Sequence, residues 1–308
     1  MTSCPPEPRV VTIGTFDGVH RGHYALISSA VDRAREIGVR ATAVTFEPVP
    51  SAVLRPDRFP GRICSAEEKF RLLATTGLDD IITVAFDRQL ASRSPEEFMD
   101  AVRATGMTEL RVGEAFALGK DRAGGVDRLR AIGEHQGFSV HAMLRETDRA
   151  EIISSSAIRN AIQEGDVVRA HRWLGRPFRV SGEVIHGAHL GRTIGYPTAN
   201  VMPPRELVPL ADGIYVSQTW LSGEESPHAS MTYVGTRPTV NSGERLVETH
   251  LFDFDGDLYG SVIDVDMFER LRGDEVFAGL DALIAQLRID ETAARAYLTR
   301  RTDFPAED

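Results

Sequence analysis

The 308-residue chain has only two cysteines, Cys4 and Cys64, which lie in unlike sequence contexts. Neither a disulfide scaffold nor a cysteine-ligated zinc site is therefore expected. The chain also lacks any apolar run approaching the roughly 18 residues of a membrane span. Its first residues, MTSCPPEPRV, show no positive region followed by an apolar stretch, so they do not read as a secretory signal. These absences predict a cytoplasmic protein without a membrane partner.

The chain also has fewer basic than acidic residues. The sequence has 35 Lys and Arg against 45 Asp and Glu, a formal net charge of -10. Nucleic acids and anionic membranes favour basic surfaces, so neither is an expected partner. A small anionic ligand in a locally positive pocket stays compatible with this balance. The length is sufficient for two domains, each with its own core.

The two halves of the chain differ in the type and order of their predicted secondary-structure elements. In the first half, short β-rich runs alternate with helix-like stretches, as in RVVTIG (residues 9–14) followed by HYALISSAVDRAREIG (residues 23–38). This alternation predicts a Rossmann-like parallel sheet with helices on its faces. The second half shows short strand-like runs broken by glycine and proline turns, then one amphipathic helix at about residues 280–298. That pattern is typical of a small antiparallel β-barrel.

The pattern changes from alternating strands and helices to successive short strands near HRWLGRPFRV, residues 171–180. We therefore predict an α/β nucleotidyltransferase-like domain over residues 1–173. A small antiparallel β-barrel domain with a C-terminal helix is expected over residues 174–308.

The segment GTFDGVHRGH, residues 14–23, directly follows the first predicted strand. In a parallel α/β sheet, ligands bind at the carboxyl ends of strands. Its glycines allow close backbone approach, and His20 and His23 can donate hydrogen bonds to phosphate oxygens at a helix N-terminus. The segment matches neither a P-loop nor a GxGxxG fingerprint. It suits nucleotidyl transfer, which needs positioning and charge stabilisation, although two surface histidines beside a turn remain an alternative.

A second segment, ISSSAIRNAI at residues 153–162, places three serines at a predicted helix start. Hydroxyls and free N–H groups there can bind an anion. Arg159, one turn further, adds a forked cation suited to a triphosphate. A plain serine cap with a solvated arginine is the alternative, but both segments in one α/β domain favour a nucleotide site.

The barrel half carries GEVIHGAHLGRTIGYPTANV, residues 182–201. Glycine-rich backbone can fold over phosphates, and Thr198 and Asn200 share one face of an extended strand. Their side-chain oxygens are hard ligands suited to Mg²⁺. Glu248 interrupts an apolar alternation and could take a proton from an alcohol that attacks ATP. A hairpin with turn glycines and a surface-facing strand glutamate are the corresponding alternatives.

Several motifs together resemble one known family, the prokaryotic bifunctional riboflavin kinase/FMN adenylyltransferase (FAD synthetase) family. GTFDGVHRGH, TFEP, RVGEAFALG and ISSSAIR are similar to its adenylyltransferase module. GRTIGYPTAN, VGTRPT and VETHLFDFDGDLYG are similar to its riboflavin kinase module. The resemblance covers essentially the whole chain.

This resemblance implies that the barrel phosphorylates riboflavin to FMN with ATP, and that the first domain transfers AMP from ATP to FMN, giving FAD and pyrophosphate. Riboflavin, FMN and ATP are then the partners and Mg²⁺ the cofactor, while no oligomeric state follows. The implied catalytic residues are Glu248, His20, His23 and Arg159. The implied ATP site of the first domain comprises Gly14, Phe16, Asp17, His20, Gly22, His23, Ser155, Ser156 and Arg159. The implied ATP and flavin site of the kinase comprises Gly187, Gly191, Arg192, Thr193, Gly195, Pro197, Thr198, Asn200 and Arg272, with Thr198 and Asn200 holding the metal.

The acceptor side of the first domain departs from the family pattern. Val49 stands where a histidine is usual, and Ala115 and Leu118 where aspartate or asparagine and phenylalanine are usual. Ala117 and Ile152 occupy places that often hold arginine. These changes remove polar groups that would orient FMN. Two alternatives therefore stay open: a riboflavin kinase with weak or altered adenylyl transfer, or a first domain that serves as a nucleotide-binding regulatory or structural module.

Overall fold

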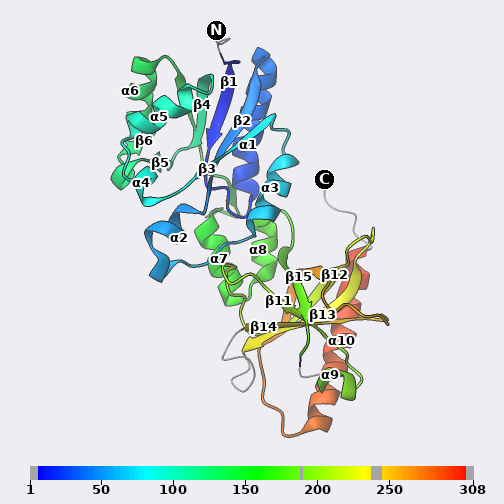
Figure 1. The fold of residues 1–308 in the computed structure, drawn as a ribbon. Helices are drawn as coiled ribbons and strands as arrows, with labels where there is room; N and C mark the ends of the chain where they lie inside the picture. The colour runs from blue at the N-terminus through cyan, green and yellow to red at the C-terminus, as the bar shows by residue number, and fades with distance from the viewer. Residues whose placement is uncertain (1–5, 188–189, 237–244, 303–308) are drawn as a thin grey trace. The chain divides into compact units, whose positions relative to one another are not determined.

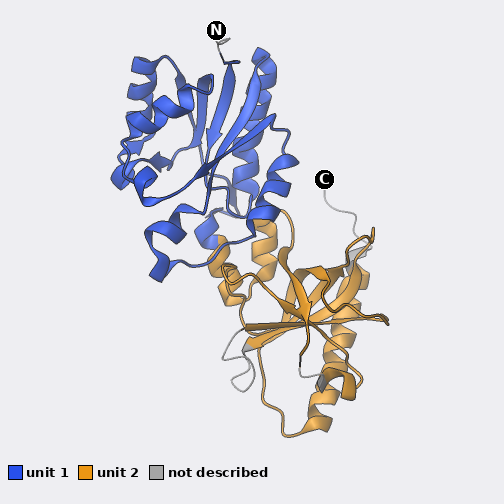
Figure 2. Cartoon of the chain, in the orientation of Figure 1, with its two compact units in different colours: residues 1–157 blue, residues 158–308 orange. Residues whose placement is uncertain are grey.

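The computed structural model describes residues 6–187, 190–236 and 245–302. The chain forms two compact units, residues 1–157 and 158–308 (Figure 2). The division falls inside helix α7 (Ser155–Glu164), whereas the composition of the sequence changes near residue 174.

The first unit is built on a five-stranded parallel sheet in the order β3-β2-β1-β4-β7 (Figure 1). Its central strands are almost entirely buried, as expected for a parallel sheet covered on both faces. The predicted Rossmann-like architecture is thereby confirmed. The strands are β1 (Arg9–Ile13), β2 (Arg40–Glu47), β3 (Asp80–Ala85), β4 (Met107–Gly113) and β7 (Ser139–Met143).

Amphipathic helices cover both faces of this sheet. On one face, Leu26, Ile27 and Val31 of α1 (Arg21–Ile37) pack into a core with strand residues such as Val10 and Ala43. On the other face, α5 (Pro95–Arg103) and α6 (Val126–Gln136) contribute to a second core. The remaining elements of this unit are α2 (Pro50–Leu54), η1 (Pro56–Arg58), α3 (Ala66–Ala74), α4 (Arg88–Ala91), β5 (Ala117–Leu118), η2 (Lys120–Arg122), β6 (Gly124–Gly125), β8 (Thr147–Asp148) and β9 (Glu151–Ile152).

The second unit contains a closed antiparallel barrel in the strand order β10-β11-β14-β13-β12-β15 (Figure 1). The predicted barrel and its C-terminal helix, α10 (Leu280–Thr302), are both confirmed. The strands are β10 (Phe178–Ile185), β11 (Ala199–Met202), β12 (Gly213–Trp220), β13 (His228–Thr236), β14 (Arg245–Leu251) and β15 (Val262–Arg272). Short α9 (Leu190–Thr193) lies between β10 and β11.

A layer of hydroxyl groups lies inside the barrel. Ser217 and Thr219 of β12, Ser230 and Thr232 of β13, and Thr249 of β14 are all fully buried. Their oxygens lie 2.7–3.3 Å apart in a continuous hydrogen-bonded set. Each hydroxyl satisfies another, so these polar groups can be buried without loss. Alternate strand residues point outward, where an apolar cluster packs with α10.

Helix α8 (Val167–Leu174) packs against the barrel strands β10 and β15. Its apolar face, which includes Val167, Ala170 and Trp173, is buried. This short helix precedes the predicted boundary but belongs to the same compact unit as the barrel. Among the described helices of both units, none combines the length and apolar character needed to cross a lipid bilayer.

Candidate functional sites of the two units

The loop between β1 and α1, which we call the nucleotide loop (residues 14–20), is tightly coiled. Phe16 and Val19 have positive φ angles of 50° and 37°, which non-glycine residues adopt rarely and usually at functional sites. A Cβ atom at Gly14 would lie 2.8 Å from the Phe16 ring, so only glycine fits there. The loop therefore holds a strained conformation at the carboxyl end of β1.

His20 and His23 meet at the start of α1. Their rings are stacked with centroids 3.6 Å apart, and the Phe16 ring meets His23 edge-on at 5.3 Å. His20 is also the N-cap, since its Nδ1 accepts a hydrogen bond from the backbone N–H of His23. Because Nδ1 is the acceptor, Nε2 carries the ring proton and can donate it. Gly22 sits beside the His20 ring, where a Cβ would lie 3.3 Å from it.

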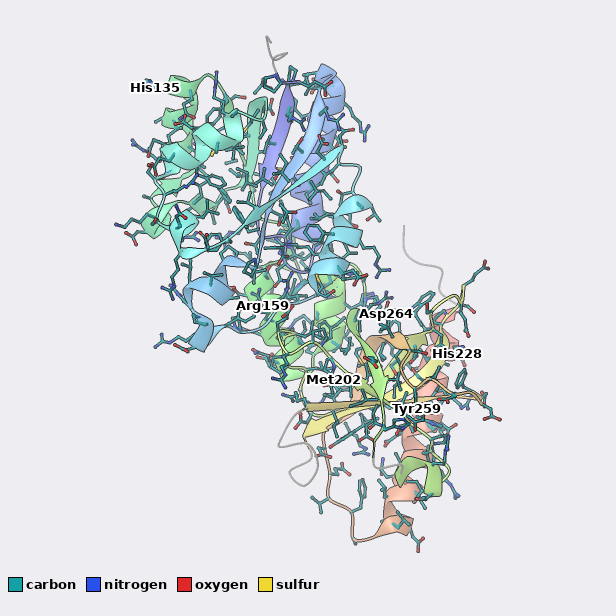
Figure 3. The ribbon with its side chains drawn as sticks, in the orientation of Figure 1. His135, Arg159, Met202, His228, Tyr259 and Asp264 are labelled. Carbon is teal, nitrogen blue, oxygen red and sulfur yellow. The ribbon has the colours of Figure 1, made fainter. Side chains whose placement is uncertain are left out.

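The first serines of ISSSAIR lie close to this loop. Ser155 Oγ donates a hydrogen bond to the carbonyl oxygen of Asp17 at 3.4 Å, which joins the α7 start to the nucleotide loop. Ser154 Oγ accepts from the N–H of Ala157, so it acts as the plain cap. Ser156 is exposed. Arg159 lies one turn along α7 (Figure 3) and falls in the second compact unit, so its role stays a prediction.

The Asp17 carboxylate turns away from solvent and is only 1 % exposed. Both of its oxygens accept from the N–H of Ile63, at 3.1 and 3.2 Å. Asp17 thus fixes the shape of the loop by binding a neighbouring backbone segment. The predicted part of Asp17 in ATP binding stays a prediction.

The candidate site of the barrel follows the register of the strands. Asn200 of β11 pairs directly with Glu248 of β14, and Glu248 pairs with Tyr233 of β13. Directly opposite residues share one face, with Cβ atoms about 4.5–5.5 Å apart. Asn200 is 8 % exposed and Glu248 is half-buried. The sheet therefore brings together two residues that are 48 positions apart in the sequence.

Two glycines leave room beside Thr198 and Asn200. A Cβ at Gly187 would lie 2.4 Å from the amide nitrogen of Asn200. A Cβ at Gly191 would lie 2.2 Å from the Tyr196 carbonyl oxygen and 3.4 Å from the Thr198 hydroxyl. Any other residue at these positions would fill the space next to the two side-chain oxygens. Glycine is therefore required at both positions of the predicted phosphate loop, because the backbone there lies very close to neighbouring atoms.

Comparison with known proteins finds matches for both units of the chain. An FAD synthetase family model matches residues 3–157, and a riboflavin kinase family model matches residues 174–298. A bifunctional riboflavin kinase/FMN adenylyltransferase from Pseudomonas fluorescens is 40% identical over 296 residues, which cover 94% of each chain. The chain belongs to the bifunctional riboflavin kinase/FMN adenylyltransferase family. The resemblance inferred from the motifs is thereby confirmed.

Two further comparisons support this assignment. A bifunctional riboflavin kinase/FMN adenylyltransferase from Escherichia coli K12 is 37% identical over 299 residues, covering 96% of this chain and 95% of its own. A solved structure described as a macrolide-efflux protein from Streptococcus pneumoniae has a TM-score of 0.86. It shares 31% identity and covers 94% of both chains. Both family modules are therefore present here in the family order.

The positions that depart from the family pattern lie in different environments. Val49 is 1 % exposed and is the N-cap residue of α2, whereas Ile152 is 45 % exposed. Ala115 is exposed, and its carbonyl oxygen accepts a hydrogen bond from Arg122 at 3.2 Å. Ala117 and Leu118 form β5, which pairs with the glycines of β6. Of these positions, Ala115 and Ile152 are exposed, and the others are buried or half-buried.

The remaining predicted kinase residues of this family member lie around the barrel site. Arg192 and Thr193 are exposed in α9, Gly195 has a φ of 83°, and the Pro197 carbonyl oxygen accepts from His250 Nδ1 at 2.7 Å. Residues 237–240 of GTRPTV lie outside the described residues.

Arg272 and His250 add two observations about this site. Glu248 pairs with Tyr233, Tyr233 with Ile214, and Ile214 with Arg272. Arg272 and Glu248 therefore lie in one row of residues that runs across neighbouring strands. The Arg272 guanidinium forms a bidentate ion pair with Asp290 of α10, with a closest distance of 2.9 Å. Sequence analysis did not single out His250, although it lies two residues after Glu248 and hence on the same strand face.

Proposed function

We propose that this chain makes FMN from riboflavin and ATP at the barrel, and FAD from FMN and ATP at the parallel-sheet unit. The observation that carries the proposal is the cross-strand pair of Asn200 and Glu248, next to glycines that leave room for phosphates. It combines a carboxylate base with a neutral oxygen ligand at one barrel position. The small-molecule substrates are riboflavin, FMN and ATP.

In the kinase step, the Glu248 carboxylate accepts the proton of the ribityl 5′-hydroxyl as its oxygen attacks the γ-phosphorus of ATP. The bond to the bridging oxygen breaks, and ADP leaves. The backbone at Gly187 and Gly191, which lies beside Asn200 and Thr198, would contact the phosphates. Thr198 and Asn200 orient the phosphates and would hold Mg²⁺.

The donor set fits that ion. Within the described residues, no group of three or more His, Cys, Asp or Glu side chains could hold a metal. Thr198 and Asn200 supply two hard oxygens, and Mg²⁺ commonly completes its shell with waters and substrate phosphates. When bound, Mg²⁺ offsets the negative charge that the phosphates carry.

In the adenylyl step, a phosphate oxygen of FMN attacks the α-phosphorus of ATP, and pyrophosphate leaves. This transfer needs no protein nucleophile. The N-terminus of α1 and the stacked pair His20 and His23 stabilise the charge on the phosphates. Ser155 and Ser156 would extend this anion site, and we assign Arg159 to the triphosphate.

The alternative is a riboflavin kinase with weak or altered adenylyl transfer. Buried Val49 and exposed Ile152 favour it, because neither offers a polar group to FMN. Chromatography of products from riboflavin, ATP and Mg²⁺ separates the possibilities. FAD is the expected end product. FMN as the sole product would support the alternative. FMN as the sole product, formed at a rate that changes when nucleotide binds to the first domain, would support a regulatory first domain.

A further inference from the structure

Lys69 of α3 is fully buried in the first unit, although it belongs to neither candidate site. Lysine is rarely buried unless its charge is paired. Its ammonium group lies 3.3 Å from Thr45 Oγ1, 3.1 Å from the Phe46 carbonyl oxygen and 2.5 Å from Glu47 Oε1. An ammonium group has three protons, so these contacts use its full donor capacity.

One arm of this hydrogen-bond network reaches the nucleotide loop through a single residue, Thr45. Thr45 accepts from Lys69 and donates its own hydroxyl proton to the carbonyl oxygen of Thr15, at 3.2 Å. Thr15 directly follows Gly14 in the strained loop. The position of Lys69 is thereby tied to the backbone that carries the candidate phosphate site.

The other arm passes through Glu47, which precedes the acceptor segment Pro48–Val49. Its carboxylate also accepts two hydrogen bonds from Arg62, both 2.8 Å long. Ile63, the next residue, donates its N–H to Asp17. The chain of contacts thus returns to the nucleotide loop from the other side.

The Glu47 carboxylate lies between two cations, Arg62 and Lys69. Burial acts to raise the pKa of Glu47, but the hydrogen bonds from Arg62 and Lys69 bring that pKa below its ordinary value. Glu47 therefore carries its negative charge. Buried ion pairs are often no more stabilising than apolar residues of similar volume. Stability alone is thus a weak reason to keep a lysine in this position.

We propose that Lys69 is a positioning residue for adenylyl transfer, which holds the nucleotide loop and the acceptor segment at a fixed separation. The inference rests on the proposed function of the first unit. In that reaction, the acceptor oxygen forms a bond to the α-phosphorus as the bond to pyrophosphate breaks. Lys69 exchanges no proton in this step. Its effect is on the alignment of the two phosphates, to which such transfers are sensitive.

The first test compares Lys69→Met with wild type in the full-length protein. This substitution leaves the bidentate pair of Arg62 and Glu47 in place. We expect kcat/KM for FAD formation to fall about 10–100-fold, the usual effect of losing charge-assisted hydrogen bonds. Riboflavin kinase activity of the same protein should stay within about twofold and serves as an internal control. Arg71→Met, which removes an exposed cation from the same helix, is the matched control.

A second variant separates positioning from stability. Thr45→Val has nearly the same volume but removes the hydroxyl that joins Lys69 to Thr15. We expect its KM for ATP to rise more than its KM for FMN, because only the arm to the nucleotide loop is broken. A purely structural role would lower the melting temperature and leave both KM values unchanged. If Lys69→Met does not fold, this comparison decides.

Three results would count against the inference, and they can be told apart. Wild-type kcat/KM in Lys69→Met, or unchanged KM values in Thr45→Val, would overturn the positioning role alone. Absence of FAD formation in the wild type, with ATP and FMN supplied, would overturn the proposed function and the inference with it.

Discussion

The two candidate sites are built in different ways. In the barrel, Asn200 and Glu248 lie within paired strands, so the ladder on each side fixes their positions. In the parallel-sheet unit, the candidate residues lie on loops and helix starts, held by caps such as His20 and by buried contacts such as Asp17 to Ile63. A paired strand defines a site by register, whereas a loop needs separate contacts for each residue.

This difference matches where the sequence departs from the family pattern. All five departures, Val49, Ala115, Ala117, Leu118 and Ile152, lie in the first unit, and the quoted kinase motifs show no comparable change. Val49 and Ala115 lie outside strands, and Ala117, Leu118 and Ile152 lie in the two-residue strands β5 and β9, so none of the five is held by a long strand ladder. The comparison therefore predicts sharp losses at the barrel site and graded effects at the loop site.

The largest effect concerns the extent of the barrel unit. A fragment of residues 174–308 lacks most of α8, and with it the buried side chains of Val167 and Trp173. Loss of such burial costs roughly 1.5–3 kcal/mol per large side chain. Urea unfolding should therefore show this fragment less stable than residues 158–308 by about 3–6 kcal/mol. Equal stabilities would place α8 outside the cooperative barrel unit.

Glu248→Gln should have the largest effect on catalysis. It keeps the shape of the side chain but removes the base, so FMN formation should fall by roughly 10²–10⁴-fold. FAD formation from supplied FMN should continue at the wild-type rate. Glu183→Gln, an exposed change on β10, is the control. A normal kinase rate in Glu248→Gln would assign this glutamate to structure.

His23→Ala should affect the other activity. Loss of a charge-assisted contact to the triphosphate should slow FAD formation about 10–100-fold. FMN formation, measured in the same preparation, should not change. His135→Ala provides a control, because His135 is exposed at the end of α6 (Figure 3). Equal FAD rates in the two variants would remove His23 from the proposed site.

A smaller effect is expected from restoring polarity to the acceptor side. Ala115 is exposed, so Ala115→Asn needs no repacking. One added neutral hydrogen bond to FMN should raise kcat/KM for FMN about 2–10-fold. Steady-state FAD formation at varied FMN measures this. An unchanged value would mean that the wild-type site already orients FMN by other groups.

The smallest effect is a pH-dependent stability difference within the first unit. Hydrogen bonds from Arg40 and Arg9 hold the pKa of Asp80 below its ordinary value. This stabilisation is therefore present above about pH 4, the unfolded pKa, and is lost as the pH falls through the folded pKa. Asp80→Asn should cost roughly 0.2–1 kcal/mol at pH 7. Denaturant unfolding should show the difference vanish in acid; a constant difference would exclude the ionic cause.

Much of the fold could be predicted from the sequence. The alternation of strand and helix patterns predicted the parallel sheet, and the glycine-rich turns between short strands predicted the barrel. The placement of His20 and His23 at a helix start was expected from the sequence, whereas the stacking of their rings was not. The pairing of Asn200 with Glu248 did not, because sequence patterns define the face of a strand but not its register against a distant strand.

Other features had no signal in one sequence. Lys69 lies among charged residues in AEEKFRLLA, where a solvated lysine is the ordinary expectation. Its burial depends on Glu47 and Arg62, which come from other segments of the fold. Likewise, Asp17 carries the same chemistry whether it faces a ligand or a backbone N–H group. Only three-dimensional contacts distinguish these cases.

The hydroxyl layer inside the barrel also affects which strand pairings can form. Its hydrogen bonds join Ser217, Ser230 and Thr249 only when β12, β13 and β14 are aligned as observed. A two-residue slip of β14 that brings Thr249 opposite Val234 would keep every side chain on its own face but separate the Thr249 hydroxyl from Thr232. An apolar interior would tolerate that error more readily, since apolar contacts are not directional. Buried hydroxyls in misaligned strands would lose their partners. The layer thus disfavours misfolded barrels whose hydrophobic pattern is otherwise acceptable.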